Sequence, residues 1–143
     1  MRKLKIGLDI HGVIDRYPLH FKWLSGQWKK NGHEVHIVTG QEWENCKEDC
    51  KNIKYVDHFS IVDYHLENVE TEMWRERGKN GVEGWWMDRE VWLKSKGEYA
   101  RNVGLDIHFD DSFEYFEWFP YNCTCILVPK VGFDAYCLDC FCF

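Results

Sequence analysis

Acidic side chains follow two apolar segments that are typical of buried strands. Asp9 comes directly after the run Lys5-Ile6-Gly7-Leu8, and Asp110 and Asp111 come after Leu105 to Phe109. Because the carboxyl ends of parallel strands meet at one edge of a sheet, we expect these three carboxylates to lie close together. Carboxylate oxygens are hard ligands that suit Mg²⁺, so the pattern predicts a magnesium site made by Asp9, Asp110 and Asp111.

Two further features could hold the oxygens of a phosphate. Thr39 and Gly40 end another apolar segment, and they offer a hydroxyl and free backbone amides to an anion. Lys94 and Lys96 lie on the predicted helix before the acidic pair, where an ammonium group would neutralise phosphate charge. Lys96 is the first candidate for this role and Lys94 the second.

Apolar runs and turn signals predict the elements that position these residues. Strands are expected over 4–10, 33–38, 55–62, 105–109 and 123–128, and helices over 17–30, 42–52, 89–102 and 113–118. Strands that alternate with helices form right-handed crossovers in an open parallel sheet. We therefore expect one α/β domain over residues 1–143, with a Rossmann-like sheet of about five parallel strands.

Residues 64–88 interrupt this alternation. Asn80-Gly81 lies between two segments rich in tryptophan, which is a strong hairpin signal. We expect a β-hairpin insertion that covers the site like a small cap, and aromatic rings beside guanidinium groups suit a base and phosphates. The candidate ligand residues on this hairpin are Trp74, Arg75, Arg77, Trp85 and Trp86. The alternative is that these tryptophans pack the hairpin onto the sheet or onto a second subunit of a homo-oligomer.

Taken in order, four segments resemble the motifs of the haloacid dehalogenase-like (HAD) phosphohydrolase superfamily over residues 4–128. They are Asp9-Ile10-His11-Gly12-Val13, Val38-Thr39-Gly40, Lys96 (or Lys94) and Asp110-Asp111-Ser112. The resemblance implies that Asp9 attacks phosphorus as a nucleophile. It also implies that Asp9, Asp110, Asp111 and the backbone carbonyl of His11 hold Mg²⁺, and that Thr39 and Lys96 bind phosphate.

His11 departs from the family pattern, which has a second Asp at this position. In the family that Asp protonates the leaving group and then activates water. An imidazole titrates near neutral pH and could take over this catalytic role, which would make an atypical phosphatase. Alternatively the chemistry stalls and the site only binds, since loss of a general acid costs about 10²–10⁴ in rate. A packing histidine without a role is the third interpretation.

Composition restricts the classes of function. The 143 residues carry a net charge of −6, which argues against binding to duplex nucleic acid. No apolar run is long enough to span a membrane, and the basic N-terminus leads into a short strand, so a cytoplasmic location is expected. Seven cysteines include Cys137, Cys140 and Cys142, which we expect to be reduced thiols, with zinc binding as the alternative.

These observations predict a Mg²⁺-dependent, atypical phosphohydrolase that acts on a small phosphorylated metabolite, with a nucleotide as the preferred ligand. The competing hypothesis is a catalytically silent binder that sequesters a nucleotide or nucleotide signal, as a phage-encoded sponge would. His108 lies just before the acidic pair, and we expect it to be a core histidine that points away from Asp110.

Overall fold

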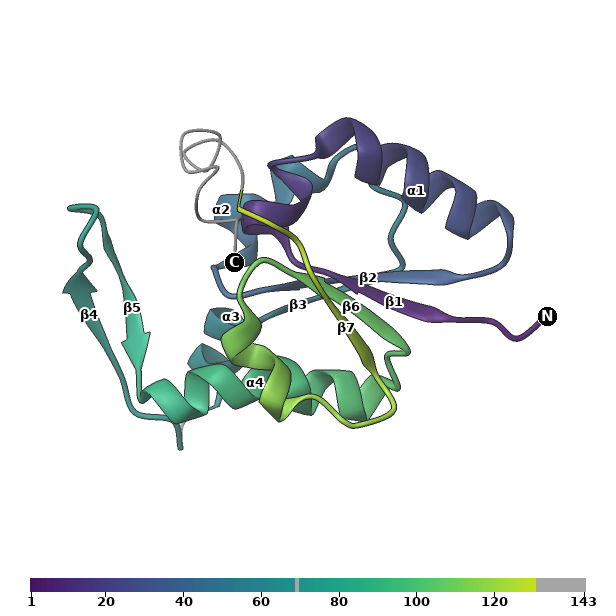
Figure 1. The fold of residues 1–143 in the computed structure, drawn as a ribbon. Coiled ribbons are helices and arrows are strands. Elements are labelled where there is room, and N and C mark those ends of the chain that lie inside the picture. The colour runs from purple at the N-terminus through teal and green to yellow at the C-terminus, as the bar shows by residue number, and fades with distance from the viewer. Residues whose placement is uncertain (69, 131–143) are drawn as a thin grey trace, which may run out of the picture.

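The computed structural model describes residues 1–68 and 70–130, and within them five strands form one parallel sheet (Figure 1). The order across the sheet is β3-β2-β1-β6-β7. The strands are β1 (Lys5–Leu8), β2 (Glu34–Thr39), β3 (Asp57–Ser60), β6 (Ile107–Asp110) and β7 (Thr124–Leu127). The predicted α/β fold with a parallel sheet is confirmed, and the central strand β1 pairs with β2 and β6.

Helices cover both faces of this sheet (Figure 1). The helical elements of the described residues are η1 (Ile10–Ile14), α1 (Pro18–Lys30), α2 (Trp43–Cys46), η2 (Lys47–Cys50), α3 (Ile61–Glu67), α4 (Arg89–Val103) and η3 (Phe113–Trp118). Ile37 and Val38 are neighbours in β2 and belong to two different cores, because side chains alternate across a strand. Phe21 of α1 packs with Ile37, and Ala100 of α4 packs with Val38. None of these helices is both long enough and apolar enough to cross a membrane.

Capping residues fix the ends of the helix that carries Lys96. The Asp88 side chain accepts hydrogen bonds from the backbone N–H groups of Glu90 and Val91, which begins α4. Gly104 ends α4 with a φ of 74°, a left-handed conformation in which glycine has no Cβ to clash. The helix predicted over 89–102 is therefore confirmed.

The helix predicted over 42–52 is wrong in extent. Only α2 is α-helical there, and the tighter turn η2 follows it. Cys46 leaves the α-helical region with a φ of −130°, while Cys46 and Cys50 are both buried in the core. The chain therefore bends at Cys46 instead of continuing as one straight helix.

A helix that the sequence prediction missed, α3, directly follows β3. The strand predicted over 55–62 is shorter than expected, because α3 begins at Ile61. The Ser60 side chain accepts a hydrogen bond from the Asp63 N–H and caps α3, which outweighs the apolar run that favoured a strand. The hairpin range 64–88 is too long for the same reason, since its first residues belong to α3.

The predicted hairpin itself is present. β4 (Met73–Arg77) pairs antiparallel with β5 (Glu83–Met87), and the pair extends away from the sheet (Figure 1). The Gly78 N–H donates to the Val82 carbonyl at 2.9 Å and closes the turn. The base of the hairpin leads into α4, so its position is tied to the helix that carries Lys96.

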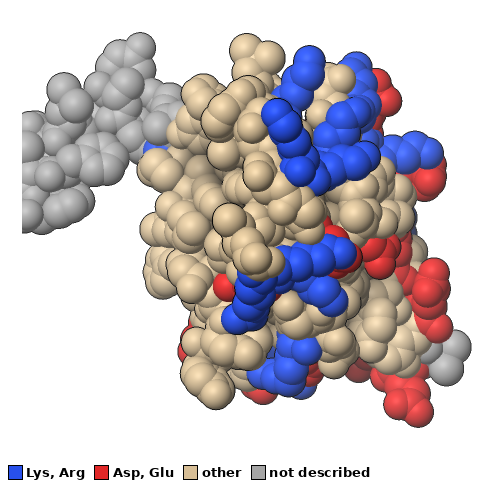
Figure 2. Space-filling model, turned by 90° about the vertical axis from the view of Figure 1, so that its right-hand side faces the viewer, with Lys and Arg blue, Asp and Glu red and all other residues tan. Residues whose placement is uncertain are grey.

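Basic side chains gather on the side of the molecule where the strands begin. Figure 2 shows many Lys and Arg side chains on this side, with Asp and Glu between them and beside them. Part of the charge is compensated, since Arg2 pairs with Asp106, and Lys3 lies 2.6 Å from Glu34. The predicted site residues follow the opposite ends of the strands.

Candidate functional site

Asp9 lies directly beyond β1, at the carboxyl edge of the sheet. Its backbone N–H donates to the Phe109 carbonyl at 3.0 Å, so the chain stays beside β6 as it leaves β1. Gly12 follows in η1 with a φ of 78°. A Cβ on Gly12 would meet the Asp111 carboxyl group. Glycine therefore allows the loop after β1 to approach the loop after β6.

Three carboxyl groups and one ammonium group meet at this edge. Asp9, Asp110 and Asp111 each offer an oxygen, and these atoms lie within 4.8 Å of one another. Lys96 of α4 places its Nζ 2.7 Å from Asp110 Oδ2 and 3.2 Å from Asp9 Oδ1. Lys96 is only 1% exposed, whereas Lys94 is partly exposed and forms no ion pair with these groups. Lys96 is therefore the lysine that the fold brings to the carboxylates.

Burial and charge together set the protonation of these groups. Burial raises the pKa of Asp9 to about 7, while Lys96 opposes the rise and Asp110 adds to it. Burial also acts to raise the pKa of Asp110, but Lys96 and His108 hold it far below its ordinary value. Burial and the Asp110 charge raise the pKa of Asp111. Asp110 is thus firmly paired with Lys96, and Asp9 is the buried carboxyl group that lacks a full counter-charge.

The donor set fits a hard divalent cation. All three side chains offer carboxylate oxygens, the ligands that such ions prefer. Three carboxyl groups face one lysine, and the raised pKa values of Asp9 and Asp111 mean that another positive charge would favour their ionised forms. Asp110 Oδ1 accepts a hydrogen bond from the Ser112 N–H at 3.1 Å, which orients the carboxylate and leaves lone pairs for a ligand.

His108 belongs to this site, and the prediction that it points away from Asp110 is wrong. Its Nε2 lies 3.0 Å from Asp110 Oδ2, and the side chain is fully buried. Side chains two positions apart in a strand share a face, which is the signal that places both residues together. The ring stacks on Phe119, with 4.6 Å between ring centroids. A Cβ on Gly7 would lie 2.6 Å from His108 Nδ1, so the glycine of β1 leaves room for the ring.

Thr39 and Gly40 lie at the end of β2, next to β1 in the sheet. The Thr39 side chain is fully buried, and its hydroxyl oxygen faces the backbone N–H of Gln41 at 3.4 Å. A Cβ on Gly40 would lie 2.6 Å from the Trp92 ring, so α4 packs closely on this turn. The predicted phosphate segment therefore lies against the same helix that carries Lys96.

Trp92 also connects this turn to Lys96. Its Nε1 donates to the Tyr115 hydroxyl at 2.7 Å, and Lys96 Nζ lies 4.2 Å from the centre of the Tyr115 ring. The ring face therefore shields the ammonium group on one side and supplies a cation–π contact. Trp92 and Tyr115 are site residues that the sequence analysis missed, because only the packing of α4 against η3 brings them together.

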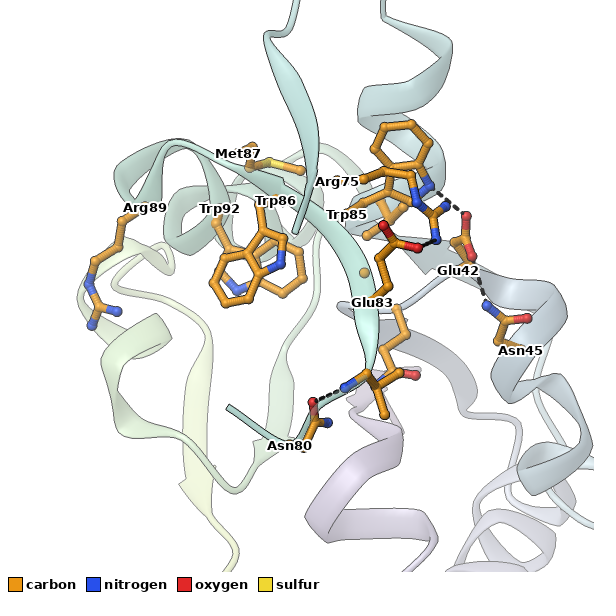
Figure 3. Close-up of a pocket in the computed structure, with 14 residues that line it drawn as sticks. Glu42, Asn45, Arg75, Asn80, Glu83, Trp85, Trp86, Met87, Arg89 and Trp92 are labelled. Carbon is orange, nitrogen blue, oxygen red and sulfur yellow. Dashed lines mark hydrogen bonds and ion pairs between the residues drawn. The ribbon is translucent and has the colours of Figure 1, made fainter. Parts of the chain in front are cut away.

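A cavity of about 640 Å³ opens between the hairpin, the turn after β2 and the start of α4 (Figure 3), and its lining includes none of Asp9, Lys96, Asp110 and Asp111. Of the predicted hairpin ligands, Arg75, Trp85 and Trp86 line it. Trp74 and Arg77 do not line this cavity. Trp85 Nε1 donates to Glu42 Oε1 at 3.0 Å, so Trp85 packs the hairpin onto the turn after β2, and ligand contact by the tryptophans stays a prediction.

His11 lies in η1, two residues beyond Asp9, and its side chain is partly exposed. Among residues 1–68 and 70–130, no side chain or backbone group forms a hydrogen bond with its imidazole. The ring is therefore close in sequence to Asp9 and free of the contacts that fix His108.

Four cysteines of the described chain are free thiols, namely Cys46, Cys50, Cys123 and Cys125. Burial raises the pKa of Cys46 to about 11 and that of Cys50 to about 12. These two thiols are therefore protonated packing groups at neutral pH. Cys137, Cys140 and Cys142, for which zinc binding is the alternative, lie outside the described residues.

Comparison with known proteins adds no family assignment. The sequence matches no protein-family model, and no curated protein matches it.

Proposed function

We propose that this protein is an atypical, HAD-like phosphohydrolase that requires Mg²⁺ and acts on a small phosphorylated metabolite, with a nucleotide as the ligand class. The observation that carries the proposal is the contact of buried Lys96 with both Asp9 and Asp110, at 3.2 Å and 2.7 Å. Asp9 follows β1, Asp110 ends β6, and Lys96 comes from α4, the helix that precedes β6. This is the order and arrangement that the resemblance to the HAD superfamily implies.

Asp9 is the proposed nucleophile. One of its oxygens bonds to phosphorus while the bond between phosphorus and the ester oxygen of the substrate breaks. Lys96 and the Thr39-Gly40 turn hold the remaining phosphate oxygens, and Asp110 keeps Lys96 charged and in place. Asp9, Asp110, Asp111 and the His11 carbonyl would hold Mg²⁺, which would supply positive charge that favours ionised Asp9.

His11 is the proposed general acid and base. Its imidazolium gives a proton to the leaving ester oxygen, so the substrate departs as an alcohol. The neutral imidazole then takes a proton from water as the water oxygen bonds to phosphorus. The bond between phosphorus and the Asp9 oxygen breaks in this second step, which releases inorganic phosphate and restores the carboxylate.

A silent binder is the second candidate, and the His11 side chain is the observation that favours it. No described residue holds the imidazole by a hydrogen bond, so the ring is not pre-oriented toward a leaving group. Without proton transfer, the rate falls by about 10²–10⁴. The same pocket would then retain a nucleotide intact, as a sponge does.

One experiment separates the two functions. The protein is incubated with Mg²⁺ and a panel of nucleotides, and both released phosphate and the ligand recovered after denaturation are measured. The phosphohydrolase predicts phosphate release that Asp9→Asn abolishes. Tight binding with all ligand recovered intact would instead establish the binder.

The His11→Asp variant sharpens this test, because it restores the residue of the family pattern. An increase in phosphate release would show that the histidine slows an otherwise competent site. His20→Asp is the matched control, since His20 is an exposed residue on α1 outside the site. If His11→Asp leaves the rate as unchanged as His20→Asp does, the histidine is not what limits turnover.

A further inference from the structure

The cavity between the hairpin and the start of α4 has two chemically different walls (Figure 3). Trp92 lies on one side of the view, and Arg75, Glu83 and Glu42 lie on the other. A flat aromatic ligand can stack on the first wall and present its polar edge to the second. Stacking on aromatic side chains contributes about 1–3 kcal/mol per base without choosing among bases. Selection must therefore come from the polar wall.

Glu42 is the fixed acceptor of the polar wall. Its Oε1 accepts a hydrogen bond from Trp85 Nε1 at 3.0 Å, and its Oε2 accepts one from Asn45 Nδ2 at 2.7 Å. Trp85 is held in turn by Arg75, whose guanidinium lies 5.1 Å from the ring centre and 3.7 Å from a Glu83 oxygen. The carboxylate is therefore oriented before any ligand binds, which reduces the entropy cost of binding.

The free lone pairs of Glu42 define the ligand edge that it can bind. A carboxylate oxygen accepts two hydrogen bonds, and in this structure each Glu42 oxygen receives one from the neighbours named above. One acceptor position remains on each oxygen, so the group fits a ligand edge with two adjacent N–H donors. Guanine has this edge, with its N1–H beside the N2 amino group. Adenine, cytosine and uracil place an acceptor next to a donor, which a carboxylate repels.

The chain connects this acceptor to the phosphate segment. Thr39 and Glu42 are three residues apart, and three residues span about 10 Å at most. Gly40 between them packs against Trp92, which lines the cavity. A nucleoside monophosphate is about as long as this upper limit, so a single ligand is long enough to reach from Thr39 to Glu42.

We propose that the cavity selects guanine, through Glu42, and that the ligand of this protein is a guanine nucleotide. The proposal rests on the proposed function for the phosphate end of the ligand only. Base recognition by Glu42 needs neither Mg²⁺ nor turnover, so it can be measured separately.

The test compares guanosine 5′-monophosphate with inosine 5′-monophosphate, which lacks only the N2 amino group. Binding of each is measured by calorimetry with EDTA present, so that no Mg²⁺-dependent turnover occurs. We expect the guanine nucleotide to bind about 10- to 100-fold more tightly, the range for one well-formed base contact. Glu42→Gln should remove most of this preference. Glu44→Gln is the matched control, because Glu44 is exposed, pairs with Lys47 and does not line the cavity.

Equal affinity for the two nucleotides would overturn the proposal, as would a preference that survives Glu42→Gln. The first comparison uses the unmodified protein and so does not depend on the folding of a variant. Ribose 5-phosphate, which has no base, tests the phosphate end with Mg²⁺. If it is hydrolysed while guanine is not preferred, the proposed function stands and the guanine proposal fails. If guanine is preferred but no nucleotide is hydrolysed, the guanine proposal stands and the phosphohydrolase fails.

Discussion

Lys96 Nζ lies 2.7 Å from Asp110 Oδ2, and both side chains are almost completely removed from solvent. A buried ion pair rarely adds much net stability, because desolvation of both groups offsets their attraction. Removal of one partner is costly, however, since the other charge stays buried and unpaired. The pair lies next to Asp9, and replacing one partner tests it directly.

Replacement of Lys96 by Met should destabilise the protein by about 3–5 kcal/mol, the usual cost of breaking a buried pair. The measurement is urea unfolding followed by circular dichroism. Lys94→Met is the matched control, because Lys94 lies on the same helix but pairs with none of the site carboxylates. A Lys96→Met protein as stable as the Lys94→Met protein would contradict the buried pair.

Mg²⁺ should stabilise the folded protein, because the carboxylate cluster exists only in the folded state. A ligand at 100 times its Kd adds about 2.7 kcal/mol to the free energy of unfolding. Asp111→Asn should reduce this gain by removing one of the three carboxylates. Thermal unfolding with and without Mg²⁺ measures the effect, and Asp49→Asn, an exposed acidic residue of η2, is the control. An Asp111→Asn protein with an undiminished Mg²⁺ response would exclude Asp111 from the cation site.

A comparison of Ala variants at Gly12 and Gly32 distinguishes the effect of backbone strain from the effect of the contact with Asp111. Both have positive φ values, 78° and 82°, so Ala strains the backbone at either position. Only at Gly12 would the added Cβ also meet the Asp111 carboxyl group, since the space at Gly32 is open. Gly32→Ala should therefore cost about 1 kcal/mol, and Gly12→Ala should cost more and also weaken Mg²⁺ binding. If Gly12→Ala and Gly32→Ala lose equal stability and bind Mg²⁺ with equal affinity, Gly12 is needed only for its positive φ.

The carboxylate site could be predicted from the sequence because it depends on the regular part of the fold. Asp9, Thr39 and Asp110 each follow or end an apolar strand, and a parallel sheet brings such ends together whatever the details of packing. The contact between His108 and Asp110 could also have been predicted, because residues two positions apart in a strand point to the same face. Whether Lys96 or Lys94 faces the carboxylates depends on how α4 is rotated about its axis. The apolar residues of α4 are not arranged regularly enough in the sequence to define that rotation.

The cavity could not be predicted, because it depends on irregular elements. Glu42 directly precedes α2, and it contacts Trp85 only because the hairpin brings that ring to the start of α2. Trp92 lines the cavity because Gly40 has no Cβ to keep α4 away. Such contacts between distant segments leave no local pattern, whereas the missed helix α3 did have a signal in its N-cap, Ser60.

Buried histidines should make the protein less stable in mild acid. His65 is 6% exposed, and its Nε2 and Nδ1 lie 2.8 Å and 2.9 Å from the hydroxyl oxygens of Ser95 and Thr71. The Ser95 hydroxyl donates to the Val91 carbonyl at 2.6 Å, so His65 Nε2 carries a hydrogen and donates it to the Ser95 oxygen. The bonds join the hairpin base to the helix of Lys96.

The pH dependence follows from burial, which lowers the pKa of His65 below its ordinary value of 6.5. The unfolded chain therefore binds a proton at a higher pH than the folded protein does. The free energy of unfolding should fall as the pH decreases below about 6.5, and the contribution of His65 is fully present only above that value. His36 and His108 act in the same direction, because burial lowers their pKa values too. Urea unfolding at a series of pH values measures this effect. The free energy of unfolding should fall less steeply with decreasing pH for His65→Gln than for the unmodified protein, whereas His20→Gln, at an exposed position, should leave the slope unchanged. Parallel curves for all three proteins would mean that His65 is protonated equally in the folded and unfolded states.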